Sequence, residues 1–173
     1  MQFQLDEGIE VLAQTPGVMS ALLRGKSAVW LNSRKTPESF SPLDVLGHLM
    51  HGEMTDWIPR VRMILEYGDA HAFEPFDRFG FRDSIAGKSV EELLDEFAEL
   101  RRQSLQTLRD LGVGEEQFDL HGMHPELGPL TLSNLLATWV VHDLGHIAQV
   151  VKTMASEYRD AVGPWRASTT ILD

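Results

Sequence analysis

One segment constrains the fold of this chain most strongly: Leu132 to Met154, with the sequence LSNLLATWVVHDLGHIAQVVKTM. Its apolar residues recur at steps of three and four, the period of an α-helix that buries one face. His142 and His146 are four residues apart, so both imidazoles project from one side of this helix, about a turn apart. Two histidines so placed can bind one metal ion. Spacing alone also allows the helix to turn them toward a water-filled groove, and a third ligand must decide.

Asp143 lies beside these histidines, and helical periodicity places it inside the apolar stripe. His146 falls at the edge of that stripe and His142 slightly further out. A carboxylate that faces an apolar core is costly unless it is hydrogen-bonded, neutralised or close to a cation. A metal-bound histidine also needs a partner for its second ring N–H, and Asp143 is a candidate for that partner.

Composition limits the classes of function. The 173 residues suit a single domain over residues 1–173, and the net charge of −11 repels phosphate backbones and acidic membranes. We therefore expect neither nucleic acid nor a membrane as a partner. The chain has no cysteine, so a metal site must use nitrogen and oxygen ligands. It shows no basic leader and no apolar run long enough to cross a bilayer, which predicts a cytoplasmic protein.

Four helices are predicted, and no strand. The first covers residues 5–25, where Thr15-Pro16 should kink it or divide it into two short helices. The second covers residues 42–67, begins after the cap Ser41-Pro42 and should bend at Pro59. The third begins at the capping box Ser89 to Glu92 and runs to about residue 111. The fourth is the long helix capped by Thr131. Residues 68–87 and 122–129 are predicted connections.

The second helix carries two further histidines, His48 and His51, and one acidic residue, Glu53, within its apolar stripe. His48 lies nearly opposite that stripe, whereas His51 is closer to it. Periodicity alone therefore favours His51 as a core-facing ligand and makes His48 a surface residue.

The connections hold other candidates. Four phenylalanines between residues 73 and 81 should pack over one end of the bundle, or else form a lid over a substrate. His121 and His124 precede the fourth helix, where they are either exposed or folded toward a pocket. In the tail after residue 163, Trp165 is expected to cover apolar surface.

Three segments together resemble the DinB-like family, which comprises four-helix bundles related to the YfiT metal-dependent enzymes and to the bacillithiol and mycothiol S-transferases. The segments are AQTPGVMSALLRG, SPLDVLGHLMHGEMTDW and HPELGPLTLSNLLATWVVHDLGHIAQVV. The resemblance covers essentially the whole chain and implies an all-α four-helix bundle with a long crossover connection. It also implies that His48, His142 and His146 are the metal ligands. Here it conflicts with the periodicity of the second helix, and we follow the resemblance, which leaves His51 as a neighbour.

The resemblance implies a divalent ion, Zn²⁺ or Ni²⁺, held by three neutral imidazoles with at least one position open. Such an ion lowers the pKa of a bound water or thiol. Because the chain has no cysteine, the thiol would be a low-molecular-weight cosubstrate, and the second substrate a small electrophile. The resemblance further implies a homodimer.

Glu53, Asp143 and His124 are candidate catalytic residues that could move protons or orient ligands, although either carboxylate could instead be structural. The predicted function is a metal-dependent thiol S-transferase or hydrolase. The alternative is a non-catalytic metal-binding bundle of a stress response, since a fold does not fix a function.

Overall fold

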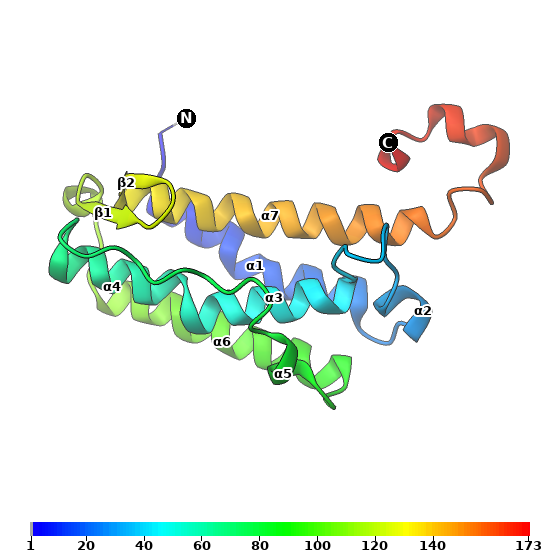
Figure 1. Cartoon of the computed structure of the whole chain (residues 1–173), viewed down its shortest axis with the longest axis horizontal. Coiled ribbons are helices and arrows are strands. Elements are labelled where there is room, and N and C mark those ends of the chain that lie inside the picture. The colour runs from blue at the N-terminus through cyan, green and yellow to red at the C-terminus, as the bar shows by residue number, and fades with distance from the viewer. Residues whose placement is uncertain (1) are drawn as a thin grey trace.

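Four long helical segments form an elongated bundle in the computed structural model, which describes residues 2–173 (Figure 1). The bundle consists of α1 (Leu5–Leu23), α3 (Pro42–Thr55) continued by α4 (Trp57–Tyr67), α6 (Val90–Asp110) and α7 (Leu132–Ser156). Both α1 and α3 pack between α6 and α7, so α1 and α3 occupy opposite corners. The connection from α1 to α3 therefore crosses the bundle, which confirms the predicted fold class.

The three predicted helix starts are confirmed. At each of them the N-cap side chain accepts the backbone N–H of the third helical residue, whose own side chain accepts the N-cap N–H. These reciprocal bonds satisfy donors that have no partner within a helix. The pairs are Ser41 with Asp44, Ser89 with Glu92, and Thr131 with Asn134.

Pro16 lies inside the single helix α1, so of the two predicted alternatives the division into two short helices is wrong. Proline lacks the N–H that would bind the carbonyl of Leu12, four residues earlier. In this bundle Arg101 of α6 donates from Nη1 to that carbonyl at 2.8 Å. A side chain from another helix therefore replaces the bond that Pro16 removes.

The second helical segment breaks at Asp56 and not at Pro59, where a bend was predicted. Pro59 has no N–H to bind the carbonyl of Thr55, so α3 ends at Thr55. The proline then occupies the first turn of α4, a position that tolerates it. Asp56 is the hinge between the two helices, with φ −117° and ψ −69°.

A short antiparallel hairpin covers one end of the bundle, formed by β1 (His121–His124) and β2 (Gly128–Thr131). No strand was predicted, because four-residue strands containing glycine and proline show no clear alternation. Gly128 adopts φ 80°, which favours glycine. The remaining short elements are α2 (Ala28–Leu31), α5 (Arg82–Ile85) and the 3₁₀ helices η1 (Glu115–Gln117), η2 (Gly163–Ser168) and η3 (Thr170–Leu172).

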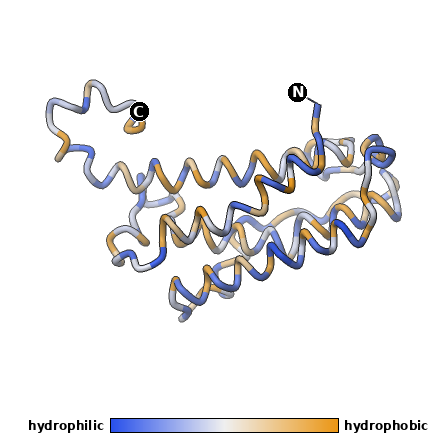
Figure 2. Tube along the Cα trace, turned by 180° about the vertical axis from the view of Figure 1, so that it is seen from behind, coloured by the Kyte–Doolittle hydropathy of each residue, from blue (hydrophilic) through white to orange (hydrophobic). Residues whose placement is uncertain are grey.

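The core consists of two apolar clusters, one toward the hairpin and one toward the opposite end. Hydrophobic and hydrophilic residues alternate along each long helix, as Figure 2 shows. Between the two clusters, each long helix contributes a buried polar or charged residue. These residues are Thr15 of α1, Glu53 of α3, Arg101 of α6 and Asp143 of α7. A polar layer therefore crosses the middle of the bundle.

The tail after α7 extends beyond the end of the bundle (Figure 1). Trp165 is 76% exposed, so the prediction that it covers apolar surface is wrong, and Leu172 is the buried residue of this segment. None of the described helices is long and apolar enough to span a membrane.

Candidate metal centre

Three histidines from two helices meet beside the polar layer. Nε2 of His142 lies 3.2 Å from Nε2 of His48 and 3.1 Å from Nε2 of His146. When the single proton of each neutral imidazole is on the outward Nδ1, three Nε2 lone pairs face one point. Nitrogen ligands about 2.1 Å from a tetrahedral ion are separated by roughly 3.4 Å. The spacing observed here is close to that value, so the three imidazoles fit a divalent cation.

The structure brings His48, and not His51, to the pair on α7. His48 is buried, with Phe40 and Phe76 packed against its ring, whereas His51 is only half-buried. The periodicity argument for His51 is therefore wrong. Six consecutive residues of α3, numbers 45–50, are buried, because loops cover the face that the apolar stripe leaves free. Gly47 allows this cover, since a Cβ there would lie 2.7 Å from the Phe81 ring.

Two of the three histidines, His48 and His146, are neutral at physiological pH. Burial, together with the neighbouring His146 and His142, lowers the pKa of His48 to about 3. Burial and His142 likewise lower the pKa of His146 to about 4. Neutral rings keep the lone pairs that a metal ion requires.

The outward ring nitrogens differ in their partners. Nδ1 of His146 is 2.9 Å from Oε1 of Gln149, and a hydrogen bond there leaves the Nε2 lone pair free. Nδ1 of His142 lies 4.0 Å from Oδ1 of Asp143. His142 Nδ1 and Asp143 Oδ1 are both buried, and neither has a hydrogen-bond partner in the described chain. Asp143 is therefore near the position predicted for it, although beyond hydrogen-bond distance.

Glu53 and Asp143 both bind Arg101, and we call these three residues the Arg101 cluster. Arg101 donates from Nη2 to Oε1 of Glu53 at 2.8 Å and from Nη1 to Oδ2 of Asp143 at 2.6 Å. Trp139 Nε1 also donates to Oε1 of Glu53, at 3.3 Å. The side chains of both acids are 0% exposed. This geometry favours the structural alternative for Glu53.

The pKa values of the two carboxylates in the cluster shift in opposite directions. Burial raises the pKa of Glu53, and Arg101 only partly offsets this. Burial also acts to raise the pKa of Asp143, but His142 and Arg101 outweigh it and lower the value. Asp143 is therefore the more firmly ionised of the two.

The sequence analysis did not single out Arg101. The signal was present, because Arg101 lies four residues after the buried Phe97 and four before the buried Leu105. It is therefore on the buried face of α6. Arg102 is on the other face, where it pairs with Glu99.

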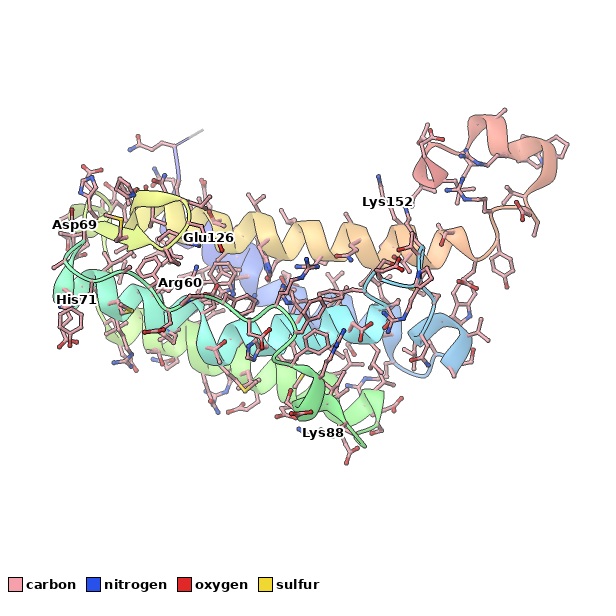
Figure 3. All side chains as sticks on the ribbon, viewed as in Figure 1. Arg60, Asp69, His71, Lys88, Glu126 and Lys152 are labelled. Atoms are coloured by element: carbon pink, nitrogen blue, oxygen red, sulfur yellow. The ribbon has the colours of Figure 1, made fainter. Side chains whose placement is uncertain are left out.

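A cavity of about 420 Å³ opens beside the histidines, with His48 and His142 in its wall. Its apolar lining comes from Trp57, Phe76, Leu127, Leu130 and Leu135, and its other polar lining from Asp56, Arg60, His124, Asn134 and Thr138. Figure 3 labels Arg60 on α4 and Glu126 in the hairpin turn, at the end of the bundle where this cavity lies. Neither Glu53 nor Asp143 lines the cavity, whereas the predicted candidate His124 does.

The hairpin turn fixes the tautomer of His124. Its Nδ1 accepts the backbone N–H groups of Glu126 and Leu127, each at 3.1 Å. An atom that accepts two N–H groups carries no proton, so the proton of the neutral ring is on Nε2. His124 therefore brings a hydrogen-bond donor to the cavity.

Asp56 is a cavity residue that sequence reasoning did not single out. It is 7% exposed, and its Oδ1 binds Nε of Arg60 at 2.7 Å. Burial raises the pKa of Asp56, against the opposing charges of Arg60 and of nearby histidines. In the sequence, only Pro59 indicated a break in this helix, and it did not identify Asp56 as a cavity residue.

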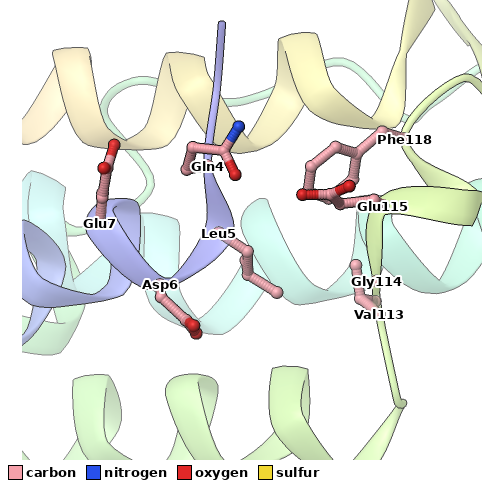
Figure 4. A pocket seen from close by; sticks show the side chains of 8 residues that line it. All are labelled: Gln4, Leu5, Asp6, Glu7, Val113, Gly114, Glu115 and Phe118. Carbon is pink, nitrogen blue, oxygen red and sulfur yellow. The ribbon is translucent and has the colours of Figure 1, made fainter.

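A second cavity, of about 510 Å³, lies between the start of α1 and residues 113–118 (Figure 4). Its lining includes the carboxylates of Asp6, Glu7 and Glu115 and contains no histidine. It is larger than the cavity beside the histidines, but the cluster of three possible metal ligands does not border it. We therefore assign the candidate site to the histidine cavity.

The fold and the histidine site together define a class of helical bundles with a potential metal centre between facing helices. Residues 12–150 match the model of the DinB superfamily, and the chain belongs to that family. No curated protein sequence matches closely enough to indicate an activity.

One solved structure that resembles this fold is YfiT from Bacillus subtilis, described as "a probable metal-dependent hydrolase with an unusual four-helix bundle topology". The TM-score is 0.73 at 22% sequence identity, and the alignment covers 89% of this chain and 87% of YfiT. At this identity the likeness establishes the shared fold.

Proposed function

We propose that this protein is a metal-dependent enzyme in which His48, His142 and His146 hold a divalent ion, Zn²⁺ or Ni²⁺. When bound, the ion would lower the pKa of a water or thiol so that a nucleophile forms at neutral pH. The observation that carries this proposal is the convergence of three Nε2 atoms in the wall of a 420 Å³ cavity. A purely structural site would have no need of that space.

The cavity indicates the kind of substrate. Its walls are mostly apolar, which suits an electrophile with an apolar body, such as an aryl ester, a chlorinated aromatic compound or an epoxide. The Nε2–H of His124 would donate to the substrate atom on which negative charge develops. A thiol nucleophile would enter as a cosubstrate, because the chain has no cysteine.

The two buried carboxylates have supporting roles in this proposal. Glu53 holds Arg101 in the polar layer and does not reach the cavity. Asp143 also binds Arg101, and its second oxygen faces the outward nitrogen of His142. Asp143 would therefore fix the orientation of His142, as carboxylates near metal sites commonly do.

Metal analysis with activity assays tests the proposal. Protein purified without an affinity tag should contain about one Zn²⁺ or Ni²⁺ per chain. His142→Ala should lose the metal, whereas the matched control His51→Ala should keep it. The loaded protein is then incubated with each class of electrophile, with bacillithiol, mycothiol, glutathione or no thiol.

We expect turnover with water or with one thiol, and its loss in His142→Ala with the helical content unchanged by circular dichroism. Bound metal without any turnover above the protein-free rate would favour the non-catalytic metal-binding bundle instead. Equal metal content in His142→Ala and the parent would show that the ligand assignment is wrong.

A further inference from the structure

We propose that Asp56 is the residue that accepts and returns the proton of the nucleophile, and that Arg60 positions it. This inference rests on the proposed function, because it concerns the same cavity. Nucleophilic attack by water or a thiol needs a proton acceptor within reach of the nucleophile. Asp56 and Arg60 both line the cavity that His48 and His142 border.

The other titratable groups of the cavity wall cannot take this role. The Nε2 atoms of His48 and His142 face each other and, in the proposed function, bind the metal ion. Nδ1 of His124 is occupied by two backbone N–H groups, and its Nε2 already carries the proton. Arg60 is always protonated. Among the titratable residues that line the cavity, Asp56 is therefore the only one with an available acceptor atom.

The backbone and Arg60 both position the Asp56 carboxylate. Asp56 is the hinge between α3 and α4, and Pro59 causes the break there. Asp56 therefore belongs to neither helix. Arg60 binds Oδ1 at 2.7 Å, and its guanidinium lies over the Phe73 ring at 5.1 Å. Because Oδ1 binds Arg60 and Asp56 lines the cavity, Oδ2 is the oxygen that we assign to a bound molecule.

The charges around Asp56 suit a group that gains and loses a proton. Burial raises the pKa of Asp56, whereas Arg60, His142, His124 and His51 act to lower it. A carboxylate whose pKa moves toward neutral pH is a stronger base than an exposed one and a better proton donor near pH 7.

The chemical step balances without a further reactant. The O–H or S–H bond of the nucleophile breaks, and the proton bonds to Oδ2 of Asp56. The electron pair stays on oxygen or sulfur and forms the bond to the electrophilic carbon. The bond from that carbon to the leaving group then breaks, the leaving group keeps its electron pair, and it takes the proton from Asp56. The carboxylate is thereby restored.

Asp56→Asn tests this role, with Asp69→Asn, an exposed aspartate outside the cavity, as the matched control. With the electrophile that the parent turns over, we expect kcat to fall roughly 100-fold or more in Asp56→Asn, because general acid–base groups contribute on that scale. Metal content and circular dichroism should match the parent, and Asp56→Glu should restore part of the rate. Asp69→Asn should leave kcat unchanged.

Arg60→Gln tests the positioning with a readout that a loss of fold would not produce. Removal of the cation raises the pKa of Asp56, so the acid limb of the kcat/KM profile should move to higher pH. Carbon-13 NMR of the aspartate carboxyl groups should show the Asp56 signal, assigned by its absence in Asp56→Asn, titrating with the same shift.

Three outcomes overturn the proposal. If Asp56→Asn keeps the parental kcat and pH profile while His142→Ala is inactive, Asp56 is not the proton acceptor and the metal-dependent function stands. If the acid limb does not follow the Asp56 titration, the same conclusion holds. If the loaded parent shows no turnover at all, the proposed function fails, and the role of Asp56 fails with it.

Discussion

The histidine triad, formed by His48, His142 and His146, and the Arg101 cluster are neighbouring polar groups inside one bundle. They differ in how their buried polar atoms are paired. His142 belongs to the first and Asp143, the next residue, to the second. In the cluster, two buried carboxylates are bound by a cation that the protein itself supplies. In the triad, three ring nitrogens face one another, and the described chain places no cation of its own between them. The cluster thus has its own counter-charge, whereas in the proposed function the triad takes a metal ion from outside the chain.

The surroundings match this difference. The cluster is enclosed by side chains from α3, α6 and α7 and by a carbonyl of α1. The triad borders a cavity open to small molecules. A buried charge without a partner is costly, so the bundle depends on the cluster for stability. In the proposed function, the triad instead holds the ion at which the nucleophile forms.

Arg101→Leu should have the largest effect on folding. It leaves two buried carboxylates without their cation and the Leu12 carbonyl without a donor. Loss of one partner of a buried ion pair costs about 3–5 kcal/mol, and we expect the free energy of unfolding in urea to fall by at least that amount. Arg102→Ala, the control on the exposed face, should unfold like the parent. Equal free energies of unfolding for Arg101→Leu and the parent would show that the Arg101 cluster does not stabilise the polar layer.

Removal of the metal should have the next largest effect. An ion that binds only the folded state stabilises it by about 2.7 kcal/mol when its free concentration is a hundredfold above Kd. A chelator should therefore lower the melting temperature of the loaded parent, while the helical fold persists at lower temperature because the Arg101 cluster is intact. The melting temperature of His142→Ala should not respond to the chelator. If the melting temperature of the parent protein is the same with and without the chelator, no ion is bound.

Asp143→Asn and Glu53→Gln separate the two regions. Both changes weaken the Arg101 cluster, but only Asp143 faces the outward nitrogen of His142. Loss of such a carboxylate typically weakens metal binding about 10–100-fold. We expect this loss in Asp143→Asn by competitive chelator titration, and parental affinity in Glu53→Gln. Parental affinity in both variants would show that the cluster and the triad are independent.

Acid should weaken the metal-free protein through His48 and His146. Folded His48 and His146 have pKa values lowered to about 3 and about 4, whereas the ordinary value is 6.5. Between these values the unfolded chain binds more protons than the folded one, so the free energy of unfolding falls as the pH drops from 6.5 toward 4. Urea unfolding of the metal-free protein across this range measures the slope. His48→Ala should show a shallower slope, and an unchanged slope would exclude His48 as a source.

Local sequence determined much of this structure. The capping residues Ser41, Ser89 and Thr131 fixed three helix starts, because a cap depends on residues only three positions apart. The four-residue spacing of His142 and His146 placed both on one side of α7 for the same local reason. Periodicity also placed Glu53 and Asp143 inside, since an amphipathic helix buries its apolar stripe together with whatever lies in it.

Tertiary structure decided the rest. Whether His48 or His51 joins the pair depends on the loops that cover α3, which the periodicity of α3 does not describe. The carbonyl that Pro16 leaves free on α1 is satisfied by Arg101 of α6, and the sequence offers no local sign of that contact. Asp56 reaches the cavity only because α4 and the hairpin close around it. Helix limits follow from interactions within a few residues, whereas a site follows from contacts between segments far apart in the chain.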